Sequence, residues 1–124
     1  MSSNLQSVFI VEDEVLVALE MADMLEEFGF TVIGPAVHQE QAIELAREEQ
    51  IDAAFLDVNL NQGKTSEPVA MILRERGVPF IFVTAYTENQ VTFRTSDELV
   101  LRKPITSSDL LAALRKFHPD YERG

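Results

Sequence analysis

The sequence predicts a doubly wound α/β domain built on a parallel sheet, and two observations carry this prediction. Five short apolar runs alternate with longer segments of helical spacing, and such runs are typical of strands that are buried on both faces. No linker rich in Pro, Gly or Ser interrupts the alternation, and 124 residues suit one compact domain. We therefore expect a single domain over residues 1–124, with a core from about residue 7 to residue 117.

The strands are expected where β-branched, aromatic and other apolar residues run together. They are expected at residues 8–11, 31–33, 53–56, 80–83 and 98–101. Gly34-Pro35 is expected to end the second strand, and Pro79 introduces the fourth. Because helical segments connect successive strands, the sheet is expected to be parallel with right-handed crossovers.

The helices are expected from apolar residues at helical spacing and from start and stop signals. They are expected at residues 14–28, 38–49, 66–77 and 106–117. Gly29 and Gly77 are stop signals for the first and third helices, and Pro68 lies in the first turn of the third. Thr106 and Asp109 form a capping-box pattern at the start of the last helix.

Residues 84–97, between the fourth and fifth strands, break the alternation. The segment is rich in polar and β-branched residues, and only Val91 and Phe93 are candidate buried anchors. A helix here is therefore expected to be short and weak, or disordered. Because sparse apolar anchoring implies a low free energy of local opening, the segment is a candidate switch element.

Composition excludes several classes of function. The formal net charge is -11, from 21 acidic and 10 basic residues, which disfavours binding to nucleic acid or anionic membranes. The absence of cysteine excludes disulfides, thiol catalysis and cysteine-rich zinc sites. His38 and His118 lie far apart in sequence and are expected at the surface. No stretch resembles a signal peptide or approaches the roughly 20 apolar residues of a membrane span, so we expect a cytoplasmic protein.

Polar residues lie directly after four of the expected strands. Glu12-Asp13 follows the first strand, Asp57 the third, Thr84 the fourth and Lys103 the fifth. Ligands of open parallel sheets bind at the carboxyl ends of the strands. We therefore expect these carboxylates, the hydroxyl and the ammonium to converge on one rim of the sheet.

Carboxylates gathered at this rim would repel one another and raise one another's pKa values. A divalent cation with oxygen ligands would relieve the repulsion, and the lack of nearby His or Cys points to Mg²⁺ or Mn²⁺. A carboxylate beside such a cation, an ammonium and a hydroxyl has the parts required for phosphoryl transfer. The cation and Lys103 would neutralise the phosphoryl oxygens, Thr84 would hydrogen-bond one of them, and a carboxylate would be the nucleophile.

Each of these residues also has a purely structural interpretation. Acidic residues after a strand often cap the next helix, as Glu12 and Asp13 would. An aspartate after a strand, such as Asp57, is common in loops. Thr84 would then simply end a strand, and Lys103 would be a solvated lysine. The functional interpretation rests on the complete set, in its order, at one rim.

In these residues the sequence resembles the receiver domains of two-component response regulators, over about residues 7–117. The resemblance implies a flavodoxin-like (βα)5 fold of strand order 2-1-3-4-5 and a cis peptide bond before Pro104. It implies that Asp57 is the phosphoacceptor, Thr84 the switch hydroxyl and Lys103 a catalytic cation. It also implies a metal cofactor, Mg²⁺ or alternatively Mn²⁺, whose ligands are Glu12, Asp13, Asp57 and the backbone carbonyl of Asn59.

Three features depart from the usual receiver pattern. The position three before the lysine, usually aromatic, is Val100. The loop at residues 58–63 lacks the usual proline, and the segment between Thr84 and Lys103 is a few residues shorter than is common.

All three departures resemble the FAT GUY subgroup of receivers, which is named for a PFxFATGY motif. Residues 79–86 match this motif except that Val83 and Ala85 replace Ala and Gly. We hypothesise that Tyr86 takes over the aromatic switch role that is missing at Val100. The alternative is a tyrosine that merely packs on the loop.

The resemblance implies a signalling switch. A sensor histidine kinase or a histidine phosphotransfer protein would present a phosphohistidine, and Asp57 would take over its phosphoryl group. Thr84 would then move inward, residues 85–97 would reorder, and a protein output target would bind or leave the altered face. Such a domain catalyses only its own phosphorylation and slow dephosphorylation, so we expect no enzyme activity on external substrates.

Two rival interpretations remain. The first is a receiver-like binding module that ignores phosphorylation, against which the retained polar set argues. The second is a metal-dependent phosphohydrolase, against which the lack of a cap domain to enclose a substrate argues.

Overall fold

The computed structural model describes residues 6–85, 91–95 and 98–117, which form a five-stranded parallel sheet of order β2-β1-β3-β4-β5. The strands are β1 (Ser7–Val11), β2 (Thr31–Ala36), β3 (Ala53–Asp57), β4 (Phe80–Thr84) and β5 (Leu99–Arg102). The helices are α1 (Val15–Glu27), α2 (Gln39–Glu48), α3 (Glu67–Arg76) and α4 (Ser107–Phe117), with a 3-10 turn η1 (Asn61–Gly63). The predicted α/β architecture and its strand order are confirmed.

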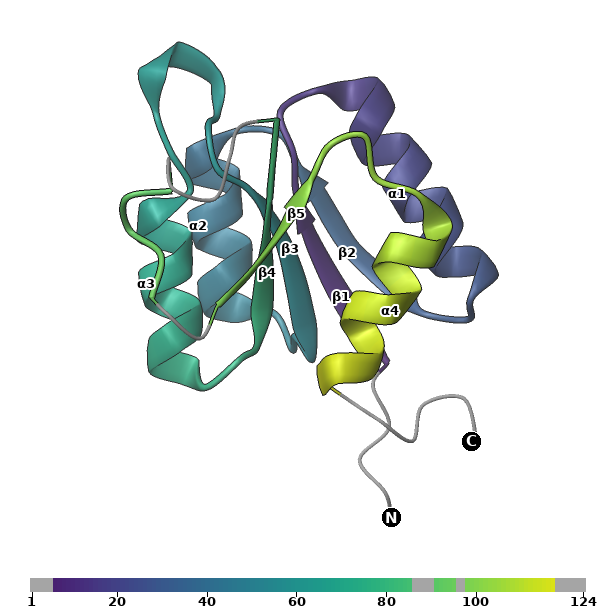
Figure 1. Ribbon diagram of the computed structural model, residues 1–124. Helices are drawn as coiled ribbons and strands as arrows, with labels where there is room; N and C mark the ends of the chain where they lie inside the picture. The colour runs from purple at the N-terminus through teal and green to yellow at the C-terminus, as the bar shows by residue number, and fades with distance from the viewer. Residues whose placement is uncertain (1–5, 86–90, 96–97, 118–124) are drawn as a thin grey trace.

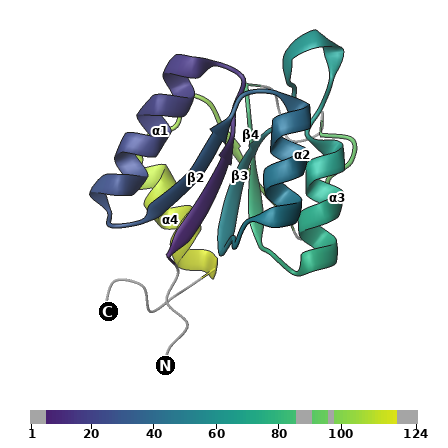
Figure 2. The same ribbon diagram turned by 180° about the vertical axis from the view of Figure 1, so that it is seen from behind.

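The helices cover both faces of the sheet. Figures 1 and 2 show α1 and α4 on one face and α2 and α3 on the other. Successive residues of β1 alternate between the two layers: Phe9 packs toward α2 and α3, while Val8 and Ile10 pack toward α1 and α4. β3 and β4 are buried along their whole length, which accounts for their continuous apolar sequences.

Three of the predicted helix boundaries have the expected chemistry. Gly29 follows α1 with φ 96°, and Gly77 ends α3 with φ 72°. At α4, the Thr106 amide donates to Asp109 Oδ2 at 3.0 Å, and the Asp109 amide donates to Thr106 Oγ1 at 3.1 Å. This pair is the capping box that the sequence predicts.

The predicted end of the second strand is wrong. β2 continues through Gly34-Pro35 to Ala36, with an irregular register against β1 between Phe9 and Val11. Proline is tolerated there because β2 is an edge strand, so the missing amide hydrogen is not needed by a further neighbour. The extension has a consequence for function, since the Ala36 carbonyl accepts a hydrogen bond from the Glu12 amide at 3.0 Å.

Gly34 is required at this turn in the strand. Its φ is 93°, and an added Cβ would lie 2.7 Å from the amide nitrogen of Ala36. Gly34→Ala should therefore lower the free energy of unfolding by about 1 to 3 kcal/mol, measured by denaturant unfolding. Gly29→Ala is the matched control, because Gly29 has φ 96° but no atom within 4 Å of an added Cβ. Equal losses in the two variants would contradict the steric explanation.

The connection between β4 and β5 contains no helix among its described residues, which are 85, 91–95 and 98. Val91 is buried, and the Phe93 ring packs edge-to-face on Phe82 with 5.4 Å between centroids. Both predicted anchors are therefore used. Tyr86 lies outside the described residues, so its predicted switch role remains a prediction.

Within the part of the chain that the structure describes, no helix is long and apolar enough to cross a membrane.

Candidate functional site

The first acidic residues of the site follow β1 directly. Glu12 is fully buried, and Asp13 is half-buried. The Glu12 backbone is held by its hydrogen bond to Ala36 of β2, and its Oε2 atom accepts a hydrogen bond from the Glu14 amide at 3.1 Å. These contacts fix a glutamate inside the carboxyl-terminal rim of the sheet, where an unpaired carboxylate would be costly.

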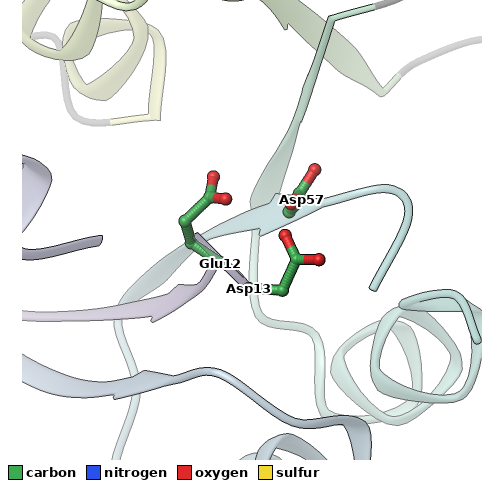
Figure 3. A group of neighbouring side chains, drawn as sticks. All are labelled: Glu12, Asp13 and Asp57. Carbon is green, nitrogen blue, oxygen red and sulfur yellow. The ribbon is translucent and has the colours of Figure 1, made fainter. Parts of the chain in front are cut away.

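Asp57 is the last residue of β3 and is only 6% exposed. The ligand oxygens of Glu12, Asp13 and Asp57 all lie within 4.8 Å of one another. Figure 3 shows the three side chains gathered at the ends of β1 and β3. The structure thus brings together three carboxylates that the sequence predicts at one rim, because β1 and β3 are neighbouring parallel strands.

Lys103 places its ammonium among these carboxylates. Its Nζ atom lies 2.9 Å from Glu12 Oε1, 3.3 Å from Glu14 Oε1 and 3.6 Å from Asp57 Oδ2. Its backbone amide donates to the Thr84 carbonyl at 2.8 Å, so β4 positions it. The peptide bond between Lys103 and Pro104 is cis, as the resemblance implies.

The electrostatics of the cluster are dominated by burial. The pKa of Asp57 is raised to about 9, mainly by burial and also by the Asp13 hydrogen bond and the Glu12 charge, against a lowering by Lys103. Burial also lowers the pKa of Lys103, but its hydrogen bond to Glu12 and the Asp57 charge outweigh this effect and raise it overall. One ammonium therefore does not neutralise the site, and Asp57 is protonated at neutral pH unless further positive charge is present.

A hard divalent cation fits this donor set. The three carboxylates offer oxygen ligands close enough to share one ion, and a second positive charge would offset the repulsion that raises the Asp57 pKa. Among the described residues, no histidine lies in the cluster, and the chain has no cysteine to favour a softer metal.

The predicted fourth ligand, Asn59, lies two residues beyond Asp57 at the start of an exposed loop. Asn59 forms an isolated antiparallel bridge with Thr65, and the Ser66 amide donates to the Val58 carbonyl at 3.0 Å. These contacts hold the loop at the site. The role of the Asn59 carbonyl as a ligand remains a prediction.

Thr84 ends β4 and is 2% exposed, opposite Arg102 in the register with β5. It therefore lies at the same rim as the acidic cluster, although its hydroxyl role stays a prediction. Val100 is half-buried on β5 and pairs with Phe82 of β4.

Glu14 is a site residue that the sequence analysis missed. Its exposed side chain pairs with Lys103, with 3.3 Å between Glu14 Oε1 and Lys103 Nζ. The available signal was its place as the third acidic residue after the first strand, but local sequence does not show which lysine it meets.

The site's geometry agrees with comparisons to known proteins. The model of the "Response regulator receiver domain" family matches residues 8–115. This chain belongs to the response regulator receiver family. In sequence it is 31% identical over 110 residues to the transcriptional regulatory protein PdtaR of Mycobacterium tuberculosis, covering 86% of this chain and 54% of that protein. The chain thus spans about half the length of the curated relatives it matches.

Solved receiver structures agree in fold. The solution structure of SdrG from Sphingomonas melonis Fr1 has a TM-score of 0.82 and 39% identity, covering 94% of this chain and 98% of that one. The receiver domain of the histidine kinase PA1611 from Pseudomonas aeruginosa has a TM-score of 0.77 at 22% identity, covering 93% and 98%. That structure has a magnesium ion coordinated in its active site cleft.

Proposed function

We propose that this receiver is a phosphorylation-operated switch in which Asp57 accepts a phosphoryl group from a phosphohistidine with the help of Mg²⁺, or alternatively Mn²⁺. The observation that carries the proposal is the convergence of three buried or half-buried carboxylates and one ammonium at a single rim. Burying several carboxylates together is costly to stability, so the cluster favours a functional role, and membership of the receiver family supports phosphorylation as that role.

In the proposed reaction an Asp57 carboxylate oxygen attacks phosphorus in line. The new bond is the O–P bond of an acyl phosphate, and the P–N bond of the donor histidine breaks, so that its imidazole leaves and takes a proton from solvent. Lys103 stabilises the equatorial phosphoryl oxygens. The metal would be held by Glu12, Asp13, Asp57 and the Asn59 carbonyl. When bound, the metal would supply positive charge that stabilises the transferring phosphoryl group.

The proposed switch begins with Thr84. Its hydroxyl would hydrogen-bond the new phosphoryl group and draw the start of the β4–β5 connection inward. Tyr86, in the segment that resembles the FAT GUY motif, would follow this movement. A solution structure of a "BeF3-activated conformation" exists for SdrG, at 39% identity to this chain, which supports a comparable response here.

The proposed partners are proteins. A sensor histidine kinase or a histidine phosphotransfer protein would supply the phosphoryl group, and a protein output target would bind the face near β4 and β5. Nucleic acid is not a proposed partner, because the net charge is -11. The domain would act in the cytoplasm and would turn over no external substrate.

Phosphoryl transfer can be tested with a small phosphoryl donor such as acetyl phosphate. With Mg²⁺, intact mass should show one phosphoryl group per chain in the wild type and none in Asp57→Asn. Asp23→Asn, an exposed carboxylate of α1, is the control and should be labelled like the wild type. No label in the wild type would favour a binding module that ignores phosphorylation, and rapid multiple turnovers would favour a hydrolase.

Glu14 should slow phosphorylation by holding Lys103. Because Glu14 is exposed, its pairing with Lys103 is worth little, and Glu14→Gln should speed phosphorylation only about two- to fivefold. The rate of acetyl phosphate labelling measures this change. Glu20→Gln, on the exposed surface of α1, is the matched control. A Glu14→Gln rate equal to that of this control would show that the Lys103–Glu14 pair has no kinetic role.

A further inference from the structure

Arg74, in the last turn of α3, reaches across to the connection between β4 and β5. Its Nε donates to Glu98 Oε2 and its Nη2 to Glu98 Oε1, each at 2.7 Å. The same Nη2 donates to the Phe93 carbonyl at 2.6 Å. One side chain thus binds two residues of the β4–β5 connection, whose described residues form no helix.

Glu98 also accepts hydrogen bonds from the residues just before it. Its Oε1 accepts a hydrogen bond from the Thr95 amide at 2.9 Å, and its carbonyl accepts one from Arg94 Nε at 2.8 Å. Its side chain is only 14% exposed, so solvent screens the pair with Arg74 weakly. A bidentate arginine–carboxylate pair is among the stronger hydrogen-bonded contacts in proteins.

Apolar contacts link the same residues to the strand that carries Thr84. Phe93 packs edge-to-face on Phe82, which lies two residues before Thr84 in β4. The Arg74 guanidinium lies 5.7 Å from the centroid of Phe80 in the same strand. Phe93 is therefore attached to the site strand through its ring and to α3 through its carbonyl.

The pair is charged under ordinary conditions. Burial raises the pKa of Glu98, but its hydrogen bonds to Arg74 and Thr95 and the Arg74 charge together outweigh burial, so the net pKa is lowered. The hydrogen bond to Glu98 raises the pKa of Arg74, against the effect of burial. Both members thus stay ionised together, as the bidentate geometry requires.

We infer that Arg74 is a positioning residue: it holds Glu98 and Phe93, in the described part of the β4–β5 connection, in their resting position and so opposes activation. The inference rests on the proposed phosphorylation switch. The connection and β5 lie between two site residues, since Thr84 directly precedes the connection and Lys103 directly follows β5. Movement of these residues toward a phosphoryl group would shift the connection, whereas the contacts of Arg74 stabilise only the resting arrangement.

The test compares Arg74→Ala, Arg74→Lys and Glu98→Gln with the wild type. Arg76→Ala is the matched control, because Arg76 lies on the same helix but donates to the Ala46 carbonyl of α2. Amide hydrogen exchange at Thr95 and Glu98 should become about tenfold faster in Arg74→Ala and stay unchanged in the control.

The decisive readout is the affinity for beryllofluoride, a phosphoryl mimic, in the presence of Mg²⁺. Loss of the pair should tighten this affinity about fivefold, because the activated state no longer competes with the resting contacts. Arg74→Lys keeps the charge without the bidentate geometry, so its beryllofluoride affinity should lie between those of Arg74→Ala and the wild type. The double variant of Arg74→Ala and Glu98→Gln should be no tighter than Arg74→Ala alone.

Faster exchange with unchanged or weaker beryllofluoride affinity would overturn the inference and leave Arg74 a structural residue. In that case the wild type still responds to beryllofluoride, so the proposed function stands. If the wild type itself shows no response, the proposed function fails and the inference falls with it.

Discussion

Asp57→Asn should make the metal-free protein more stable at neutral and alkaline pH, although it removes the proposed phosphoacceptor. Burial and the neighbouring acids raise the pKa of Asp57 from 3.8 to about 9, so ionising this carboxyl in the folded state is unfavourable. Asparagine keeps the shape and cannot ionise. At about pH 8 the gain in the free energy of unfolding should be about 1 to 3 kcal/mol.

The sign of the pH dependence follows from proton binding. Between the unfolded pKa of 3.8 and the folded pKa of about 9, the folded state binds more protons at Asp57 than the unfolded state. Stability of the wild type should therefore fall as pH rises through this window. In Asp57→Asn this contribution is absent, so the stability curve should be flatter.

Denaturant unfolding in the presence of a chelator, at several pH values, measures both effects. Asp23→Asn is the control, since this exposed carboxylate lies outside the cluster. Addition of Mg²⁺ should stabilise the wild type and reduce the advantage of the variant. An Asp57→Asn protein that is less stable than the wild type at alkaline pH, with the same dependence of stability on pH, would contradict the unfavourable ionisation of Asp57 in the folded state.

Lys103→Ala should separate metal binding from phosphoryl transfer. Lys103 Nζ lies 3.6 Å from Asp57 and 2.9 Å from Glu12, so its loss leaves the carboxylates without their resident cation. Mg²⁺ should then bind at least as tightly as in the wild type, because the site is more negative. Labelling by acetyl phosphate should be slower by about 100-fold, because the positive charge facing the transferring group is gone.

Calorimetric titration with Mg²⁺ and time-resolved intact mass check the two halves of this prediction. Lys64→Ala is the matched control, since this lysine is exposed on the loop after β3. Weaker Mg²⁺ binding together with normal labelling in Lys103→Ala would assign the lysine to metal retention instead of phosphoryl transfer.

The fold was largely predictable because its strands are buried on both faces. Short, continuous apolar runs such as those of β3 and β4 are typical of strands covered by helices on both faces of a parallel sheet. The convergence of Asp57 with the acidic pair followed from strand topology alone, since parallel neighbours end at one rim.

The features that the sequence analysis got wrong or missed have a common cause: they depend on contacts between distant parts of the chain. β2 extends past Pro35 because it is an edge strand, and sequence alone does not say which strand is at the edge. The ion pairs of Glu14 with Lys103 and of Arg74 with Glu98 join residues that only the folded backbone brings together. Charged side chains of this kind carry no periodic signal, so local patterns leave their partners open.

The most direct test is an amide NMR titration of wild type and Asp57→Asn with Mg²⁺, followed by beryllofluoride. Mg²⁺ should shift resonances near Asp13 and Asp57 in the wild type. Beryllofluoride should then shift those of Thr84 and residues 91–98, and this second response should be absent from Asp57→Asn. Mg²⁺ binding without any beryllofluoride response in the wild type would contradict the phosphorylation switch, and the domain would then be a receiver-shaped binding module.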